Sequence, residues 1–298
     1  MNLPIHFVIA GAQKSASSYL QSCLREHPGL WMPRYETPCF ESPFYENGAV
    51  HALQSALLSQ RNPDGVQAGI KCPDFLAKAE CPHRLRKHAP SAKIIVVLRN
   101  PTERFMSALF WYQQIGLLPV TRPADILQKL HDSSFLRDYP RAAELVEYGF
   151  YAECLTRYFN HFDRQQILCL EHSQLLEEPV RTVERVYEFL GVDTGFRPRS
   201  LGSAKKAAVY HPLRLKILSR ASPLFYDFED RPGKSALDWR RGRWIANFAY
   251  RLVTAFDSQV LGRVLSNEKP VLEPDLLRQV SAWYRGDIRE LEQLLGWD

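Results

Sequence analysis

Short apolar runs separated by helical patterns occupy the first two thirds of the chain. Four of these runs are rich in β-branched residues and are bounded by polar residues, proline or glycine, which is typical of buried strands. They lie at 5–10, 68–71, 93–98 and 166–170. Apolar positions at helical spacing lie at 17–26, 101–113, 151–161 and 180–190. This alternation predicts an α/β fold of three layers, with a central parallel sheet flanked by helices.

The strand pattern stops after Gly191, and the rest of the chain indicates a helical C-terminal region. Apolar positions at helical spacing recur at 205–222, 239–265 and 274–295. The first two of these segments are basic and aromatic, which has two interpretations. They form a helical subdomain that buries its own apolar faces, or they make a weak contact with a membrane surface through 205–265.

Composition places the chain among soluble globular proteins. It has 298 residues, of which 45% are hydrophobic and 24% charged, and a net charge of +5. No apolar run approaches the roughly 18 residues that a membrane span needs. Met1 is followed almost at once by the first strand pattern, so no secretory leader is expected. The six cysteines lack metal-site or disulfide spacing, so we expect reduced thiols, no metal and a cytoplasmic location.

The stretch 7-FVIAGAQKSASSYLQSCLREHP-28 has the pattern of an anion-binding loop. An apolar strand ends at Gly11, and small residues then lead into a helix, whose first N–H groups lack internal partners and carry the positive end of the helix dipole. Lys14 adds a full charge, and Ser15, Ser17 and Ser18 add hydroxyl groups. The alternative is an ordinary helix, capped by Ser15 or Ser17, with Lys14 in solvent.

The loop differs from the phosphate loop of ATP- and GTP-hydrolysing enzymes. In the Walker A motif the lysine directly follows the second glycine, whereas Lys14 comes three residues after Gly11 and the chain has no Gly-Lys pair. No apolar run ends in an aspartate that would hold magnesium. A nucleotide kinase or NTPase is therefore disfavoured, although it remains the alternative, together with a nucleotide-binding module without catalysis.

A second motif, 93-KIIVVLRNPTERFMSALFWY-112, suits a phosphate monoester. Arg99 follows a strand directly, at the carboxyl end where open α/β sheets bind ligands. Ser107 lies two turns into the next helix, and an arginine with a serine hydroxyl matches phosphate oxygens. Alternatively, Arg99 pairs with Glu103, and Ser107 is buried against the sheet.

Together the two motifs resemble those of the sulfotransferases that use 3′-phosphoadenosine 5′-phosphosulfate (PAPS), especially the heparan-type and bacterial carbohydrate branches. The first is similar to their 5′-phosphosulfate loop, G-x-x-K-x-G-T-T-x-L, and the second to their 3′-phosphate motif. Residues 148–192 and 282–298 are similar to later segments of the family. The resemblance implies a single P-loop-like domain over 1–298, with a nucleotide-binding core at 1–197, a helical insertion or flap at 198–266, and a loop and helix closing on the core at 267–298.

The resemblance also implies an enzyme that moves a sulfuryl group from PAPS to a hydroxyl acceptor and releases adenosine 3′,5′-bisphosphate, with no metal and no nucleic-acid partner. A polysaccharide, a glycolipid and a secondary metabolite all remain open as acceptors, and the carbohydrate class is favoured. The nucleotide-binding residues carried over from the family are Gly11, Lys14, Ser15, Ala16, Ser17, Ser18, Arg99, Ser107 and Lys269. The sequence does not indicate the oligomeric state.

Three residues receive catalytic roles from the resemblance. Glu36, in the segment 34-RYETPCFESPFY-45, matches the general base, with Glu41 as the second choice. Lys14 would neutralise the departing phosphate, and Lys71, at the end of a strand, would orient the sulfonate or an acidic acceptor. Without the resemblance, Glu36 and Lys71 are interpreted as solvent-facing residues.

The chain departs from the family's loop at Ala16, where the family has glycine. Alanine adopts a positive φ only at a cost. We therefore expect this loop either to be right-handed at Ala16 or to carry strain there.

Overall fold

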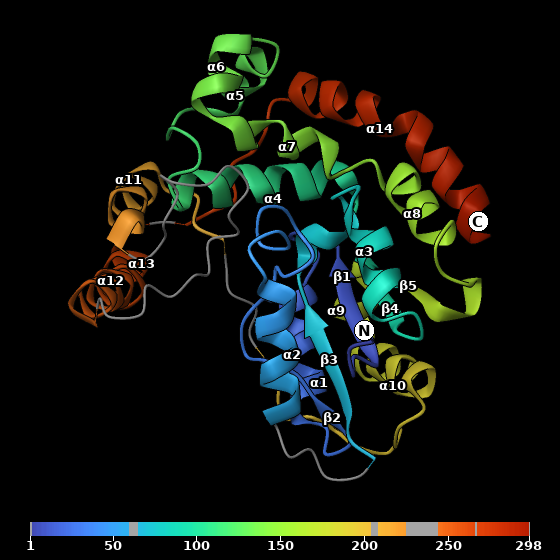
Figure 1. The fold of residues 1–298 in the computed structure, drawn as a ribbon. Coiled ribbons are helices and arrows are strands. Elements are labelled where there is room, and N and C mark those ends of the chain that lie inside the picture. Colours follow the sequence, from blue (N-terminus) through green and yellow to red (C-terminus); the bar gives the residue numbers. More distant parts are fainter. Residues whose placement is uncertain (1, 60–64, 204–207, 225–243, 266, 298) are drawn as a thin grey trace. The chain divides into compact units, whose positions relative to one another are not determined.

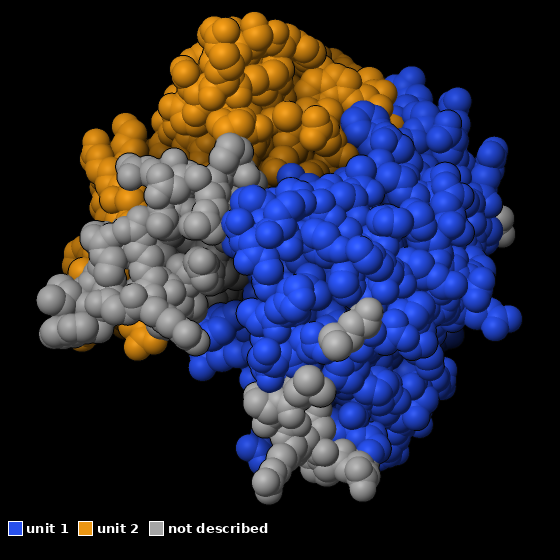
Figure 2. Space-filling view, in the orientation of Figure 1, with its two compact units in different colours: residues 1–104, 150–205, 285–298 blue, residues 105–149, 206–284 orange. Residues whose placement is uncertain are grey.

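The structure, a computed structural model, describes residues 2–59, 65–203, 208–224, 244–265 and 267–297. The chain divides into two compact units, coloured separately in Figure 2. Unit 1 comprises 1–104, 150–205 and 285–298, and unit 2 comprises 105–149 and 206–284. The expected division of one domain into 1–197, 198–266 and 267–298 stays a prediction. The helical patterns expected at 205–222 and 239–265 lie partly outside the described residues.

Unit 1 is built on a parallel sheet of five strands in the order β2-β3-β1-β4-β5 (Figure 1). The strands are β1 (Phe7–Gly11), β2 (Leu30–Trp31), β3 (Gln67–Lys71), β4 (Lys93–Leu98) and β5 (Ile167–Glu171). The predicted α/β class and four of the strands are confirmed. Strand β2 was not predicted, because a strand of two residues has no measurable period.

Helices cover both faces of this sheet. Those of unit 1 are α1 (Ser17–Glu26), α2 (Ala49–Ser59), α3 (Cys81–His88), α8 (Tyr151–Phe159), α9 (His172–Glu177) and α10 (Pro179–Leu190), with short 3₁₀ helices η1 (Pro73–Leu76) and η3 (Arg164–Gln166). Two more, α4 (Pro101–Gln114) and α14 (Pro274–Leu295), contribute residues to both units. The long predicted helices agree with these bounds to within two residues, whereas α2, α3 and α9 were not predicted.

Alternate residues of a strand point to opposite faces, and the core follows this rule. In β1, Val8 and Ala10 belong to one buried cluster, whereas Phe7 and Ile9 belong to another. The first cluster includes residues of α3 and α8, and the second includes residues of α1 and α10. The sheet is therefore the middle of three layers.

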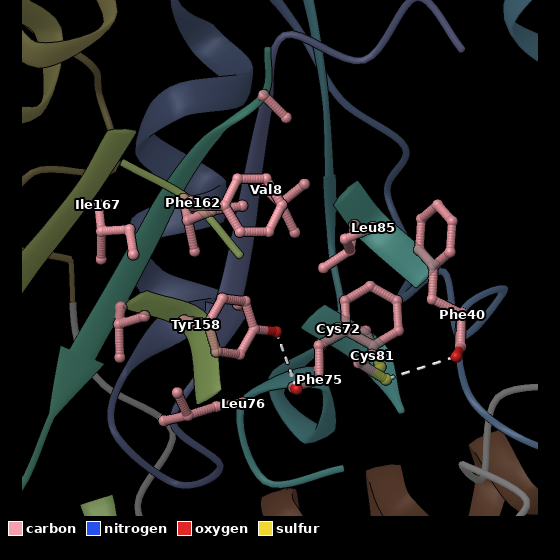
Figure 3. Close-up of a cluster of buried hydrophobic side chains, with 14 of the residues drawn as sticks. Val8, Phe40, Cys72, Phe75, Leu76, Cys81, Leu85, Tyr158, Phe162 and Ile167 are labelled. Atoms are coloured by element: carbon pink, nitrogen blue, oxygen red, sulfur yellow. Dashed lines mark hydrogen bonds between the residues drawn. The ribbon is translucent and has the colours of Figure 1, made fainter. Parts of the chain in front are cut away.

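Two polar groups inside the first cluster donate hydrogen bonds to nearby backbone (Figure 3). The Tyr158 hydroxyl donates to the Phe75 carbonyl at 2.9 Å, and the Cys81 thiol donates to the Phe40 carbonyl at 3.4 Å. Both acceptors lie outside the strands, in η1 and in the loop before α2. The cluster thus ties these connections to the helices that cover the sheet.

Unit 2 is helical. It contains α5 (Pro123–Lys129), α6 (Ser133–Asp138), η2 (Pro140–Ala142), α7 (Glu144–Glu147), α11 (Pro212–Ala221), η4 (Ser222–Leu224), α12 (Trp244–Phe256), a π-helical turn η5 (Asp257–Leu261) and α13 (Gly262–Val264). Buried ions in this unit are paired. Arg214 donates two hydrogen bonds of 2.8 Å to Asp257, and Arg141 donates one of 2.7 Å to Glu144.

The strand order determines which loops meet. Since β1 lies between β3 and β4 and all three are parallel, the residues after these strands emerge at the same edge of the sheet. Lys71 is the last residue of β3, Arg99 follows β4, and the loop with Lys14 follows β1. The two motifs and the predicted lysine therefore converge at one edge.

Candidate active site

The loop between β1 and α1 is held from both sides. The Ala12 N–H donates to the Val97 carbonyl at 2.8 Å, and the buried Gln13 amide donates to Asp74 at 3.1 Å. A side chain at Gly11 would lie 2.9 Å from the Pro73 carbonyl, so this glycine is required for packing against η1. The Gln13–Asp74 pair was not predicted, because the two residues are 61 positions apart and belong to no common motif.

The backbone of the loop is left-handed at two residues. Lys14 has φ 65° and Ala16 has φ 64°, so the second of the two expectations for Ala16 is met. Ala16 is also the first residue before α1, and no described side chain caps this helix. The alternative of a serine-capped helix is therefore wrong. The first turn of α1 contains no acidic residue, and its positive end suits an anion.

Replacing Ala16 by glycine is expected to stabilise the protein by about 1 kcal/mol, because glycine adopts φ 64° without the clash that an L side chain makes. Urea denaturation followed by circular dichroism measures the change. Ala52→Gly in α2 is the control, since an exposed helical alanine should lose about 1 kcal/mol on the same change. A loss of stability in Ala16→Gly similar to that of Ala52→Gly would contradict the left-handed loop.

Ser15 is the clearest unsatisfied group in the loop. Its side chain is fully buried, and its hydroxyl has no hydrogen-bond partner among the described residues. A buried hydroxyl without a partner is unfavourable by about 1–3 kcal/mol. An oxygen-rich ligand held by the loop would supply the missing acceptor, which is the fit that a phosphate or phosphosulfate group provides.

Lys14 lies in a cluster of positive charge. Burial, above all, lowers the pKa of its ammonium group to about 8, and the nearby Arg99 and Lys71 lower it too, while Glu36 raises it. Three cations in one place disfavour one another's charge, and a bound anion removes this repulsion. The electrostatics of the loop therefore favour an anionic ligand.

This value predicts how nucleotide binding depends on pH. Below pH 8 Lys14 carries its proton, and above pH 8 it loses the charge that attracts phosphate. The affinity for adenosine 3′,5′-bisphosphate should therefore fall above pH 8, by up to about tenfold per pH unit. Calorimetric titration from pH 7 to 10 measures the change. In Lys14→Arg the affinity should change little over this pH range, because arginine stays charged. If the affinity of this variant falls above pH 8 as it does in the unchanged protein, a group other than Lys14 causes the fall.

Arg99 pairs with Glu103, as one of the two alternatives predicts, and also contacts the loop after β1. Its guanidinium donates to the carboxylate of the exposed Glu103 at 3.0 Å, and Nη1 donates to the backbone carbonyl of Lys14 at 3.3 Å. The pairing with Glu103 is thus present, yet the guanidinium also reaches the loop after β1. This places Arg99 beside Lys14, as the two-motif interpretation predicts.

Lys71 connects the loop to Glu36. Its ammonium group donates to the Ser18 hydroxyl at 2.7 Å and to the Glu36 carboxylate at 2.9 Å. Only 2% of the Lys71 side chain is exposed, against 22% for Glu36, so the interpretation of both as solvent-facing residues is wrong. The Thr37 N–H also donates to the Lys71 carbonyl at 2.9 Å, which fixes the segment that carries Glu36.

Glu41, the second choice for the base, is placed differently. Its side chain is fully buried, and Oε1 accepts a hydrogen bond of 2.6 Å from the Cys72 thiol. The structure thus brings Lys14, Arg99, Lys71 and Glu36 together at one edge of the sheet and leaves Glu41 in the core. Ser107 and Lys269 belong to unit 2, and their nucleotide-binding roles stay predictions. No group of three or more His, Cys, Asp or Glu residues suited to a metal occurs in the described ranges.

Comparison with known proteins identifies the family of the chain. The family model described as "Sulfotransferase domain" matches residues 4–208. Human heparan sulfate glucosamine 3-O-sulfotransferase 6 is 28% identical over 242 residues, which cover 74% of this chain and 68% of that protein. Human heparan sulfate glucosamine 3-O-sulfotransferase 3B1 is 28% identical over 185 residues, which cover 62% of this chain and 45% of that protein. The chain thus spans from about half to two thirds of these curated relatives.

Solved structures share the fold. A sulfotransferase from Alicyclobacillus acidocaldarius aligns over 99% of this chain and 96% of its own, with a TM-score of 0.66 and 20% identity. A mouse sulfotransferase complexed with PAP aligns over 96% of this chain and 85% of its own, with a TM-score of 0.50 and 16% identity. The family model covers more than half of the chain, including both motifs. The chain therefore belongs to the family of PAPS-dependent sulfotransferases, as its two nucleotide motifs indicated.

Proposed function

We propose that this sulfotransferase binds PAPS at the carboxyl edge of β3, β1 and β4 and transfers its sulfuryl group to a hydroxyl of a carbohydrate or another small molecule. The observation that carries the proposal is the meeting of Lys14, Arg99 and Lys71 at the start of an uncapped helix, with the partly exposed carboxylate of Glu36 bound to Lys71. The donor supplies an activated sulfuryl group whose departure leaves a phosphate.

Each residue has a role that its surroundings support. Lys14 and the positive end of α1 stabilise negative charge on the leaving phosphate, as donors do in an oxyanion hole. Arg99 holds a second phosphate and, through the Lys14 carbonyl, the loop itself. Glu36 takes the proton of the acceptor hydroxyl, and Lys71 fixes the carboxylate by an ion pair of 2.9 Å.

A carbohydrate acceptor is supported by the names of the curated relatives, which are heparan sulfate sulfotransferases. The test is an acceptor screen with ³⁵S-labelled PAPS, in parallel with calorimetric titration of adenosine 3′,5′-bisphosphate. We expect nucleotide binding and transfer to at least one hydroxyl acceptor. Binding without any transfer would favour the non-catalytic module, and magnesium-dependent ATP hydrolysis would favour the kinase or NTPase. The cytoplasmic location stays a prediction.

We also propose a weak contact between the α12–α13 segment and an anionic membrane surface. Every fourth residue of this segment is apolar and exposed, with 43–75% of each residue accessible. These residues are Phe248, Leu252, Phe256, Val260 and Val264. The exposed Arg251 and Arg263 lie on the same segment, and this combination is typical of helices that lie in the membrane interface. In the part of the chain that the structure describes, no helix is long and apolar enough to span a bilayer.

Liposome flotation tests this contact. The protein is expected to float with vesicles of phosphatidylcholine and phosphatidylserine and to remain at the bottom with phosphatidylcholine alone, since part of the attraction is electrostatic. Leu252→Glu combined with Phe256→Glu should abolish flotation. Failure of the unchanged protein to float with either vesicle would refute the contact.

A further inference from the structure

A cavity of about 520 Å³ lies within unit 2, and the described residues that line it include none of those assigned above. The end of α4, the loop before α5, the start of α11, Glu268 and Pro270 contribute to its wall. Its apolar lining includes Phe110, Val120, Tyr210 and Leu215. Cavities of this size and character typically hold small organic ligands.

The aromatic part of the wall is rigid. The rings of Phe110 and Tyr210 meet edge to face, with centroids 5.0 Å apart and an interplanar angle of 87°. The Tyr210 N–H donates to Asn267 at 2.8 Å, and Asn267 in turn donates to the Ala208 carbonyl at 2.7 Å. Both ends of the Tyr210 segment are therefore bonded to Asn267, which positions the Tyr210 ring in the wall.

One polar atom in the lining lacks a partner. Gln113 is fully buried, and its Nε2 donates to the carbonyls of Pro119 and Thr121 at 3.0 and 2.7 Å. These two bonds fix the orientation of the amide. Its Oε1 has no hydrogen-bond donor among the described residues. A buried acceptor without a donor is unfavourable, so a donor beyond the described residues, such as one on a ligand, would stabilise the site.

We propose that this cavity binds a neutral apolar group, such as an aromatic ring, that carries one hydroxyl or amide N–H as donor to Gln113 Oε1. The apolar wall would contact the ring, and the amide oxygen would select ligands with a donor over those without one. Polar and charged residues, among them Arg122 and Lys216, also line the cavity and are exposed, which leaves room for a charged extension of the ligand. The inference goes beyond the proposed function, since none of the described lining residues has been assigned to the nucleotide or to catalysis.

Binding of two matched probes to the full chain tests the proposal by calorimetry. 2-Naphthol has the rings and a donor, whereas 2-methoxynaphthalene has the same rings without one. We expect 2-naphthol to bind about two- to tenfold more tightly, the effect of one net hydrogen bond. Val120→Trp should weaken both probes at least about tenfold by filling the cavity, and Gln113→Leu should remove the preference for the donor. Gln114→Leu, the same change one residue away, should change neither.

Adenosine 3′,5′-bisphosphate binding, measured on each variant, shows whether unit 1 is intact and keeps this test separate from the proposed function. Gln113→Leu also removes the bonds to Pro119 and Thr121, so Val120→Trp, which retains them, tests the cavity independently. Absence of saturable binding, equal affinity for the two probes, or unchanged binding in Val120→Trp would each overturn the proposal.

Discussion

Replacing Lys14 by alanine is expected to weaken adenosine 3′,5′-bisphosphate binding by about 10- to 100-fold, the contribution of a hydrogen bond between charged groups. It is expected to lower kcat for sulfuryl transfer by a further 10²–10³-fold or so, because a charge that stabilises the leaving phosphate acts most strongly in the transition state. The reason lies in the surroundings of Lys14. Burial and neighbouring cations already lower the pKa of its ammonium group to about 8. A bound anion offsets the repulsion among these cations, so its attraction to the charged Lys14 is strong. Calorimetry and labelled-donor kinetics measure the two effects.

A control lysine variant and an arginine variant complete this test. Lys87→Ala removes an exposed lysine of α3 and so changes the net charge by the same amount as Lys14→Ala. It should leave the affinity for adenosine 3′,5′-bisphosphate and kcat unchanged. Arg99→Ala should weaken nucleotide binding strongly, but kcat at saturation should fall less, since Arg99 is assigned to the second phosphate. Nucleotide binding that survives both Lys14→Ala and Arg99→Ala would refute the site.

The fold was predictable where the sequence pattern is long. Four strands and the helices of ten or more residues at 17–26, 180–190 and 274–295 carry enough apolar positions to show a period, and the structure places them within two residues of expectation. The two-residue β2 and the eight-residue α3, most of whose residues are polar, carry no such signal. These elements form because the rest of the sheet packs against them, and a local pattern does not record this.

The site was predictable to the extent that it lies in contiguous motifs. Lys14 and Arg99 each follow a strand, and the order of the strands brings them together. The Lys71–Glu36 ion pair joins residues 35 positions apart, so only the family resemblance linked them. Nothing in the sequence indicated that Lys71 is buried or that it also binds Ser18, because burial of a lysine depends on partners that the fold supplies.

Replacing Glu36 by glutamine is expected to lower kcat by about 10²–10⁴-fold, the usual contribution of a general base. Adenosine 3′,5′-bisphosphate affinity should change by less than about tenfold, because the loop, Lys14 and Arg99 remain. The glutamine still offers an oxygen to Lys71, yet the buried ammonium loses its ion pair, so some loss of stability accompanies the change. Kinetics must therefore be measured well below the unfolding temperature of the variant.

The pH profile separates a base from a residue that only supports Lys71. If Glu36 takes the proton, kcat of the unchanged protein falls on the acid side as the carboxylate is protonated, and Glu36→Gln removes this limb together with most of the activity. If Glu36 serves only to hold Lys71, kcat of Glu36→Gln is lower at every pH but still falls on the acid side. Glu41→Gln provides the comparison: Glu41 is fully buried and bonded to Cys72, so its replacement should affect stability more than the pH profile. If Glu41→Gln loses the fall of kcat on the acid side and Glu36→Gln retains it, Glu41 is the base. The loop at 34–45 would then have to rearrange before the acceptor binds.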